Sequence, residues 1–178
     1  MKQIVLLIVD MQSGLIENEP YNRDVILQAT EKLISVARRE GIEVIFVRHG
    51  DSSGELKIGT DGWEIYDTVK PMSGEKIFDK THCSAFRGTL LKEYLDKKKI
   101  KTIVLMGMQT EYCIDTTCRV AYEYGYSVII PEGGTTTFDN ITFKANELLK
   151  YYEQKIWNKR FASIIPIEDV TTKMCSKN

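Results

Sequence analysis

The sequence is poor in the residues that build metal sites, redox motifs and membrane spans. Its two histidines are His49 and His82, and neither belongs to a cluster of convergent donors, so we predict no metal site. The cysteines show no closely spaced pair; they are Cys83, Cys113, Cys118 and Cys175. A reduced, cytoplasmic protein is therefore expected, although an even number of cysteines leaves a disulfide open. No apolar run approaches the ~20 residues that a membrane span requires.

The charge of the chain is nearly balanced, with 24 Lys and Arg residues against 25 Asp and Glu residues and a net charge of -1. Such a balance gives no extended field for nucleic acid or an acidic membrane surface, and we expect neither as a partner. The 178 residues, 43% of them apolar, suit one domain with a sizeable core. We expect this domain to span residues 1–178, with residues 171–178 as a polar tail.

Two hydrophobic periods alternate along the chain. Short continuous apolar runs predict buried parallel strands at residues 4–9, 43–47, 102–106, 128–130 and, more weakly, 162–165. Helical stripes follow at residues 25–37, at 90–95, from about 113 to before 125 with Thr110 as N-cap, and after Asp139 with Ile141 turned inward. This alternation predicts right-handed crossovers and a three-layer α/β/α domain.

Three chemically useful side chains stand at the ends of predicted strands. Asp10 follows residues 4–9, Lys80 ends the short run 75–79, and Cys113 opens a helix after residues 102–106. Since parallel strands deliver their C-terminal ends to one edge of a sheet, we expect the three to meet. The helix start and the Lys80 ammonium would favour a thiolate at Cys113, and Asp10 could take its proton. Each residue alone has a plain structural role, and their joint placement is what indicates catalysis.

The motifs VDMQ (residues 9–12), KTHCSAF (80–86) and GMQTEYC (107–113) resemble those of the isochorismatase-like cysteine hydrolases. That superfamily includes nicotinamidases, N-carbamoylsarcosine amidohydrolases and ureidoacrylate hydrolases, and the resemblance runs from about residue 3 to 166. It implies a six-stranded, mostly parallel sheet flanked by helices. It also implies Asp10 as general base, Lys80 as electrostatic partner and Cys113 as nucleophile. A cis peptide before Gln109 would turn the N–H groups of Gln109 and Cys113 into an oxyanion hole.

The implied reaction is hydrolysis of a small amide, ureido or carbamoyl compound through a thioester on Cys113. The chain lacks the Asp-x-His…His metal cluster of one nicotinamidase type, which weakens a nicotinamidase assignment. True isochorismatases cleave a vinyl ether and typically lack the cysteine, so Cys113 points away from that chemistry. We expect no cofactor, a small-molecule substrate, and a homodimer or homotetramer as in other members of the superfamily.

The long polar segment 49–74 predicts a functional loop, because structureless loops of this length are uncommon in compact domains. Within it, Trp63 is a candidate aromatic lid over a planar substrate. The predicted substrate-binding residues are Gln12, His49, Trp63, Phe86, Met108, Tyr112 and Thr117.

Two other functions stay open from the sequence. The chain could be a thiol redox protein that uses Cys113 with Cys118 or Cys83, although five residues of helix separate Cys113 from Cys118 awkwardly for a disulfide. It could also be a catalytically silent binding module of the same fold. The redox alternative assigns no role to Asp10 and Lys80.

Overall fold

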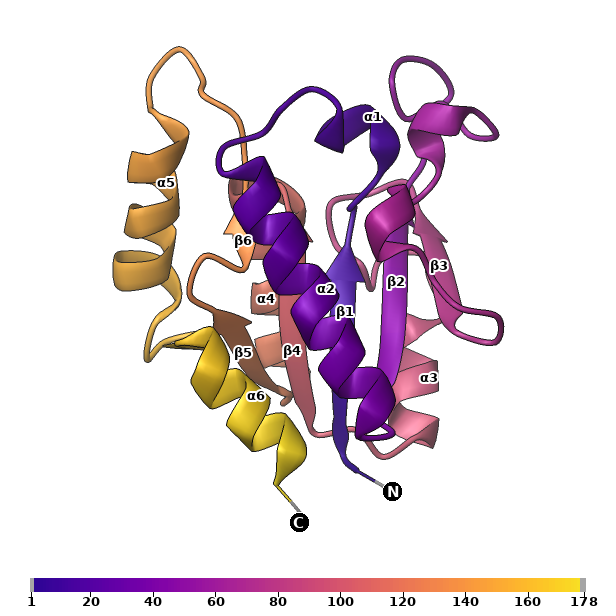
Figure 1. Ribbon diagram of the computed structural model, residues 1–178, viewed down its shortest axis with the longest axis vertical. Coiled ribbons are helices and arrows are strands. Elements are labelled where there is room, and N and C mark those ends of the chain that lie inside the picture. The colour runs from indigo at the N-terminus through magenta and orange to yellow at the C-terminus, as the bar shows by residue number, and fades with distance from the viewer. Residues whose placement is uncertain (1, 177–178) are drawn as a thin grey trace.

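A parallel sheet forms the middle layer of the molecule (Figure 1). The computed structural model describes residues 2–176. The strands run in the order β3-β2-β1-β4-β5-β7, with short β6 paired to the end of β4, and every pairing is parallel. Their bounds are β1 Ile4–Val9, β2 Glu43–His49, β3 Lys76–Lys80, β4 Thr102–Met108, β5 Ser127–Pro131, β6 Thr135–Thr136 and β7 Ser163–Ile165.

Helices cover both faces of the sheet. In Figure 1, α2 and α6 lie in front of it, and α3 and α4 lie behind it. Short turns η1 to η4 and two further helices complete the chain. The bounds are α1 Ser13–Ile16, α2 Arg23–Arg39, η1 Asp61–Trp63, η2 Asp67–Val69, α3 Leu91–Lys97, η3 Thr110–Ile114, α4 Asp115–Glu123, α5 Ala145–Tyr151, η4 Tyr152–Trp157 and α6 Ile167–Cys175. No helix within residues 2–176 has the length and apolar character needed to cross a membrane.

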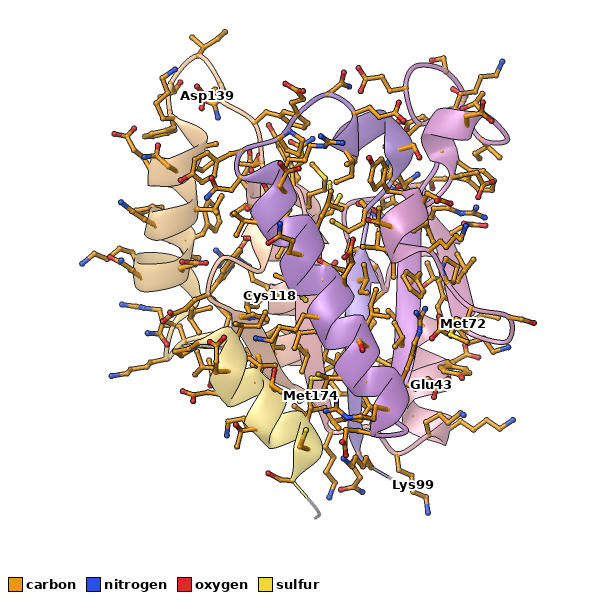
Figure 2. All side chains as sticks on the ribbon, viewed as in Figure 1. Glu43, Met72, Lys99, Cys118, Asp139 and Met174 are labelled. Carbon is orange, nitrogen blue, oxygen red and sulfur yellow. The ribbon has the colours of Figure 1, made fainter. Side chains whose placement is uncertain are left out.

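The central strands are apolar on both sides because each side packs against helices. Along β1, Leu6 and Ile8 belong to the core beneath α2 and α6, whereas Leu7 and Val9 belong to the core beneath α3 and α4. Figure 2 labels one sulfur-containing side chain from each core: Met174 comes from α6 in front of the sheet and Cys118 from α4 behind it. The predicted three-layer α/β/α fold with six strands in its main sheet order is therefore confirmed.

Two local predictions differ from the structure. Residues 171–175 are not part of a polar tail, because they complete α6 and bury Met174; residues 177–178 of that predicted tail lie outside the described part. Ile141 does not turn inward but is fully exposed, since α5 begins only at Ala145. The Asp139 carboxylate, from the loop above α5 in Figure 2, accepts a hydrogen bond of 2.9 Å from the N–H of Ala145.

The backbones of β1 and β4 leave no room for a side chain at one position where both strands reach the carboxyl edge of the sheet. Val9 is the register partner of Gly107. A Cβ built on Gly107 would lie 1.9 Å from the carbonyl oxygen of Val9, and the φ angle of Gly107 is +127°. Only glycine tolerates both the contact and this backbone conformation. The side chains that follow the two strands, Asp10 and Cys113, are therefore brought together by a position that cannot carry a side chain.

We predict that Gly107→Ala lowers the free energy of unfolding by about 3 kcal/mol or more, because a methyl group there collides with main chain rather than with a side chain that can move. Urea denaturation followed by circular dichroism measures the loss. Gly125→Ala is the matched control: this glycine also has a positive φ of +84°, yet nothing lies within 4 Å of the position that its new methyl group would take. A Gly107→Ala protein as stable as the Gly125→Ala protein would contradict the close-approach argument.

Candidate active site

Asp10, Lys80 and Cys113 meet at the carboxyl edge of the sheet. Asp10 follows β1, Lys80 is the last residue of β3, and Cys113 lies in η3, the turn that follows β4. The Nζ atom of Lys80 lies 2.7 Å from Oδ2 of Asp10 and 3.2 Å from Sγ of Cys113. The exposed fractions of Asp10 and Lys80 are 1% and 3%, so their ion pair is shielded from water. The convergence predicted from strand ends is present.

A third hydrogen bond engages the last N–H group of the Lys80 ammonium. Its Nζ lies 3.0 Å from Nδ1 of His49, the last residue of β2. An ammonium has three N–H donors and no acceptor, so Nδ1 of His49 must accept and its proton belongs on Nε2. Nε2 in turn lies 3.2 Å from Oδ1 of Asp51, so the N–H at Nε2 donates a hydrogen bond to this carboxylate oxygen. The network thus extends from Cys113 through Lys80 and His49 to Asp51.

One oxygen of Asp10 is left without a protein partner. Oδ2 pairs with Lys80, whereas Oδ1 is buried and accepts no hydrogen bond from the described residues. A carboxylate oxygen of Asp10 and Sγ of Cys113 lie within 4.8 Å of each other. Asp10 also has a left-handed φ of +55°, held by the hydrogen bond of 2.9 Å from its N–H to the carbonyl of Val47. The geometry therefore offers the thiol a buried carboxylate as proton acceptor.

The electrostatics of Cys113 differ from the prediction that the helix start and Lys80 favour a thiolate. Burial raises the pKa of the Cys113 thiol, the negative charge of Asp10 raises it further, and the ammonium of Lys80 only partly opposes them. Burial by itself would lower the pKa of Lys80, but the interactions of the ammonium with Asp10 and Cys113 outweigh it and leave that pKa raised. The resting site therefore combines a Lys80–Asp10 ion pair with a protonated thiol.

The turn that carries Cys113 is fixed at its start. The Met108–Gln109 peptide bond is cis, and the N–H groups of Tyr112 and Ile114 both donate to the carbonyl of Gln109, at 3.2 and 3.1 Å. Thr110 does not cap the helix as predicted. Its hydroxyl instead lies 3.0 Å from that of Thr135 and donates to the carbonyl of Thr136, because β6 runs beside the turn. The N–H of Gln109 donates to no described residue.

A cavity of about 190 Å³ opens above the thiol. It is lined by Asp10, Leu15, His49, Asp51, Leu56, Gln109, Tyr112 and Cys113. A larger groove of about 850 Å³ lies elsewhere, at the opposite ends of β4, β5 and β7, where Thr102, Ser127 and Ser163 line it. The wall of that groove contains no cysteine or histidine. The smaller cavity, in contrast, is lined by a thiol, an imidazole and two carboxylates, which are groups that can take part in catalysis.

Two of the predicted substrate-binding residues line this cavity, namely His49 and Tyr112, and 55% of Tyr112 is exposed. Gln12 lies behind it, fully buried. Its amide nitrogen donates to the carbonyls of His49 and Trp63, at 2.9 and 2.7 Å, and its amide oxygen accepts from the N–H of His49 at 2.8 Å. Gln12 therefore ties the end of β2 to the long loop rather than facing the cavity.

The structure does not bring the other four predicted residues to the cavity. Trp63 stacks on Arg48, whose guanidinium lies 3.4 Å from the centre of the indole ring. Met108 is buried in the core, and Phe86 packs against other aromatic rings. The hydroxyl of Thr117 accepts a hydrogen bond from the N–H of Ala85. Trp63 was predicted as a lid because it belongs to the long loop, and Thr117 because it follows Cys113 by one helical turn. Neither a place in the loop nor closeness in sequence to a motif determines which way a side chain points.

Sequence reasoning missed three wall residues, Leu15, Asp51 and Leu56. Leu15 comes from α1, directly after the VDMQ motif, and the other two come from the long loop after β2. The length and polarity of segment 49–74 had marked this loop as functional. Nothing in the sequence distinguished Asp51 and Leu56 from their neighbours, because their placement depends on how the loop folds back.

The donor set does not suit a metal ion. Asp10, His49 and Cys113 each offer one ligand atom, and these atoms lie within 4.8 Å of one another. Each of the three residues, however, already accepts a hydrogen bond from the Lys80 ammonium. A second cation would meet that charge in a buried site, where repulsion is poorly screened. The donors are arranged around Lys80 instead.

The geometry gives little support to a redox couple. All four cysteines are free, and Cys118 is buried in the core. Burial raises the pKa of Cys118 to about 12, and Cys113 is also held protonated. Redox-active cysteines combine exposure with thiolate character, and this pair has the reverse properties.

Comparison with known proteins places this geometry in context. A family model described as the Isochorismatase domain matches residues 4–166. The isochorismatase family protein YrdC of Bacillus subtilis (strain 168) is 30% identical over 137 residues, which cover 75% of this chain and 73% of that protein. Streptothricin hydrolase of Streptomyces noursei is 30% identical over 138 residues, which cover 75% of this chain and 54% of that protein. A crystal structure of an isochorismatase family protein has a TM-score of 0.85 and 31% identity, covering 92% of this chain and 98% of that one.

We predict that Lys80→Met lowers the free energy of unfolding by about 3–5 kcal/mol, because it leaves the Asp10 carboxylate buried without its partner. The double variant Asp10→Asn/Lys80→Met removes both charges and should recover most of the loss. Urea denaturation at neutral pH compares the three proteins. If the double variant were no more stable than Lys80→Met, the buried ion pair would not be the interaction that the single substitution breaks.

Proposed function

Because the chain belongs to the isochorismatase family, we propose that this hydrolase is a metal-independent cysteine enzyme that cleaves a small amide, ureido or carbamoyl compound. The observation that carries the proposal is the buried Asp10–Lys80 pair in contact with the thiol of Cys113, with one Asp10 oxygen free to accept a proton. A cavity of about 190 Å³ suits a small substrate. The name of the streptothricin hydrolase relative is in keeping with hydrolysis in this family.

The first half of the reaction forms a thioester. Asp10 takes the thiol proton as Cys113 attacks the carbonyl carbon, so the sulfur becomes nucleophilic only as the carbon–sulfur bond forms. Lys80 stabilises the sulfur and the carboxylate by hydrogen bonding throughout. The protonated Asp10 then gives its proton to the departing nitrogen, and the carbon–nitrogen bond breaks to release ammonia or an amine.

The negative oxygen of the tetrahedral intermediate needs donors close to Cys113. The N–H of Gln109, which donates to no described residue, and the N–H of Cys113 are the groups we assign to this oxyanion hole. Both belong to the segment that β4 and β6 hold in place through Thr110. Loss of one such donor typically raises an acyl-transfer barrier by about 3 kcal/mol.

The second half of the reaction returns the enzyme to its starting state. Asp10, ionised again after the amine leaves, takes a proton from water as that water attacks the thioester carbonyl. The carbon–sulfur bond breaks, the sulfur regains the proton from Asp10, and the acid or carbamate is released. One carboxylate serves in both halves because it gains and loses one proton in each, the first taken from the thiol and the second from water.

We predict that Cys113→Ala lowers the rate of ammonia release from a panel of small amides by at least about a thousandfold, because the cavity wall contains no second cysteine and no serine, threonine or lysine that could replace the thiol. Coupled-enzyme detection of ammonia measures the rate, and rapid acid quench followed by peptide mass spectrometry detects the acyl group on Cys113 of the wild type. Cys83→Ala, an exposed cysteine outside the cavity wall, is the control and should keep full activity. Equal rates for wild type and Cys113→Ala would refute the mechanism, as would a wild type that cleaves no member of the panel.

We predict that Asp10→Asn makes Cys113 easier to ionise and yet inactive. Asp10 raises the pKa of the thiol and Lys80 lowers it, so removal of the carboxylate charge should shift the pH dependence of Cys113 alkylation at least about one pH unit lower. Iodoacetamide labelling followed by peptide mass spectrometry gives this curve.

Asp79→Asn is the matched control for that experiment, since its carboxylate is half exposed, next in sequence to Lys80 and paired with Arg48. It should leave the alkylation curve in place. An unchanged curve for Asp10→Asn would show that this carboxylate does not hold the thiol proton.

A further inference from the structure

We infer that the substrate is neutral or positively charged next to its reacting carbonyl, and that the carboxylate of Asp51 recognises the positive or hydrogen-bond-donating group. The inference rests on the proposed function, since it concerns the same cavity. Three observations support the inference: the charges of the residues that line the cavity, the hydrogen bonds of Asp51, and the small volume of the cavity. It excludes amides that carry a carboxylate close to the scissile bond.

The cavity wall contains no free cation. Its eight residues, all within the described part of the chain, include the acids Asp10 and Asp51 but no Lys or Arg. Lys80 lies beneath the wall, and its three N–H groups are already taken by Asp10, His49 and Cys113. Asp10 and Lys80 cancel in charge, so Asp51 gives the cavity a net negative charge.

Asp51 is placed to act on a substrate. About half of its side chain is exposed, and it lines the cavity. One oxygen accepts from Nε2 of His49 at 3.2 Å, while the other accepts no hydrogen bond from the described residues. Its backbone is fixed on both sides, since its N–H donates to the carbonyl of Leu56 at 2.9 Å and its carbonyl accepts from the N–H of Ile58 at 3.1 Å. A free carboxylate oxygen on a fixed backbone is a preorganised acceptor.

The nearby cations do not neutralise Asp51. Lys57 lies in the same loop and is exposed, but makes no ion pair with it. Arg48 precedes His49 on β2 and therefore points to the other side of the strand, where it binds Asp79 and Glu64 at 2.8 and 2.7 Å. No lysine or arginine among the described residues forms an ion pair with Asp51. Its negative charge is therefore left to be balanced by solvent or by the molecule that occupies the cavity.

The small volume makes charge decisive for selectivity. In about 190 Å³, a substrate group beside the carbonyl cannot move far from Asp51 or keep its full hydration. A carboxylate there would meet Asp51 with no cation to offset the repulsion, whereas an ammonium or amide N–H would gain a charge-assisted hydrogen bond. Like-charge contacts of this kind are a common source of discrimination between otherwise similar ligands.

Three thiol-alkylating probes of similar size test the inference without requiring turnover. They are 2-bromoethylamine (cationic), iodoacetamide (neutral) and iodoacetate (anionic). In each, the Cys113 sulfur displaces the halide to form a carbon–sulfur bond, and the thiol proton passes to Asp10 and then to solvent. Peptide mass spectrometry measures the rate at Cys113 separately from the other cysteines, and division by the rate with a small neutral thiol removes intrinsic reactivity.

We expect the normalised rate for the cation to exceed that for the anion by about tenfold or more in the wild type. Asp51→Asn removes the charge but keeps an amide oxygen that can accept from His49, so the preference should fall to about two- or threefold, and the rate with iodoacetamide should fall by less than the rate with 2-bromoethylamine. Asp61→Asn makes the same charge change on an exposed side chain of η1 outside the cavity wall and should leave the preference intact.

A wild-type preference for iodoacetate, or an Asp51→Asn protein with the wild-type preference, would overturn the inference. Turnover is judged separately with the small amides glycinamide, propionamide and malonamate, which carry a positive charge, no charge and a negative charge beside the carbonyl. If none of them is cleaved while the alkylation preference follows Asp51, the proposed amide hydrolysis fails and the charge selectivity stands. If amides are cleaved and malonamate is the best substrate, the selectivity fails and the hydrolase function stands.

Discussion

The three hydrogen bonds of the Lys80 ammonium organise the catalytic edge of the sheet. A cation buried to this degree is stable only where acceptors replace its water shell, and here Asp10, His49 and Cys113 each supply one. The acceptors come from three different parts of the chain, after β1, at the end of β2 and in the turn after β4. A single side chain on an edge strand thereby fixes the relative positions of the Asp10 carboxylate, the Cys113 thiol and the His49 imidazole.

The same network explains how a cysteine can be kept ready and yet unreactive toward general oxidants. The thiol is protonated at rest because burial and Asp10 outweigh Lys80, and a protonated thiol reacts slowly with peroxide or disulfides. In the proposed mechanism, proton transfer to Asp10 becomes favourable only when a carbonyl carbon is in place to accept the sulfur's electron pair. Activation is thus tied to substrate occupancy rather than to a permanently low thiol pKa.

Sequence alone reached the fold and the three central residues because both follow from strand periodicity, which is local and strong. Residues 4–9 and 102–106 are continuously apolar, so Asp10 and Cys113 had to lie at one edge of a parallel sheet. Strand periodicity does not predict which side chains line the cavity and which lie away from it. Gln12 and Thr117 bind backbone groups, and Asp51 enters through the return of a long loop; such placements depend on tertiary contacts that no periodicity encodes. The thiol's protonation was also out of reach, since it reflects burial and a charge 103 positions away in the sequence.

Main-chain groups of the loop that supplies Asp51 and Leu56 take part in several of the hydrogen bonds that fasten it to the segment after β1. The N–H of Ser13 donates to the carbonyl of Glu64, that of Tyr66 donates to the carbonyl of Met11, and the Gln12 amide grips the backbone at Trp63. Backbone anchors do not depend on which side chains the loop presents. Substitutions in this loop can therefore accumulate during divergence without disturbing proton transfer at the sheet edge, so that new substrate ranges evolve on an unchanged chemical centre.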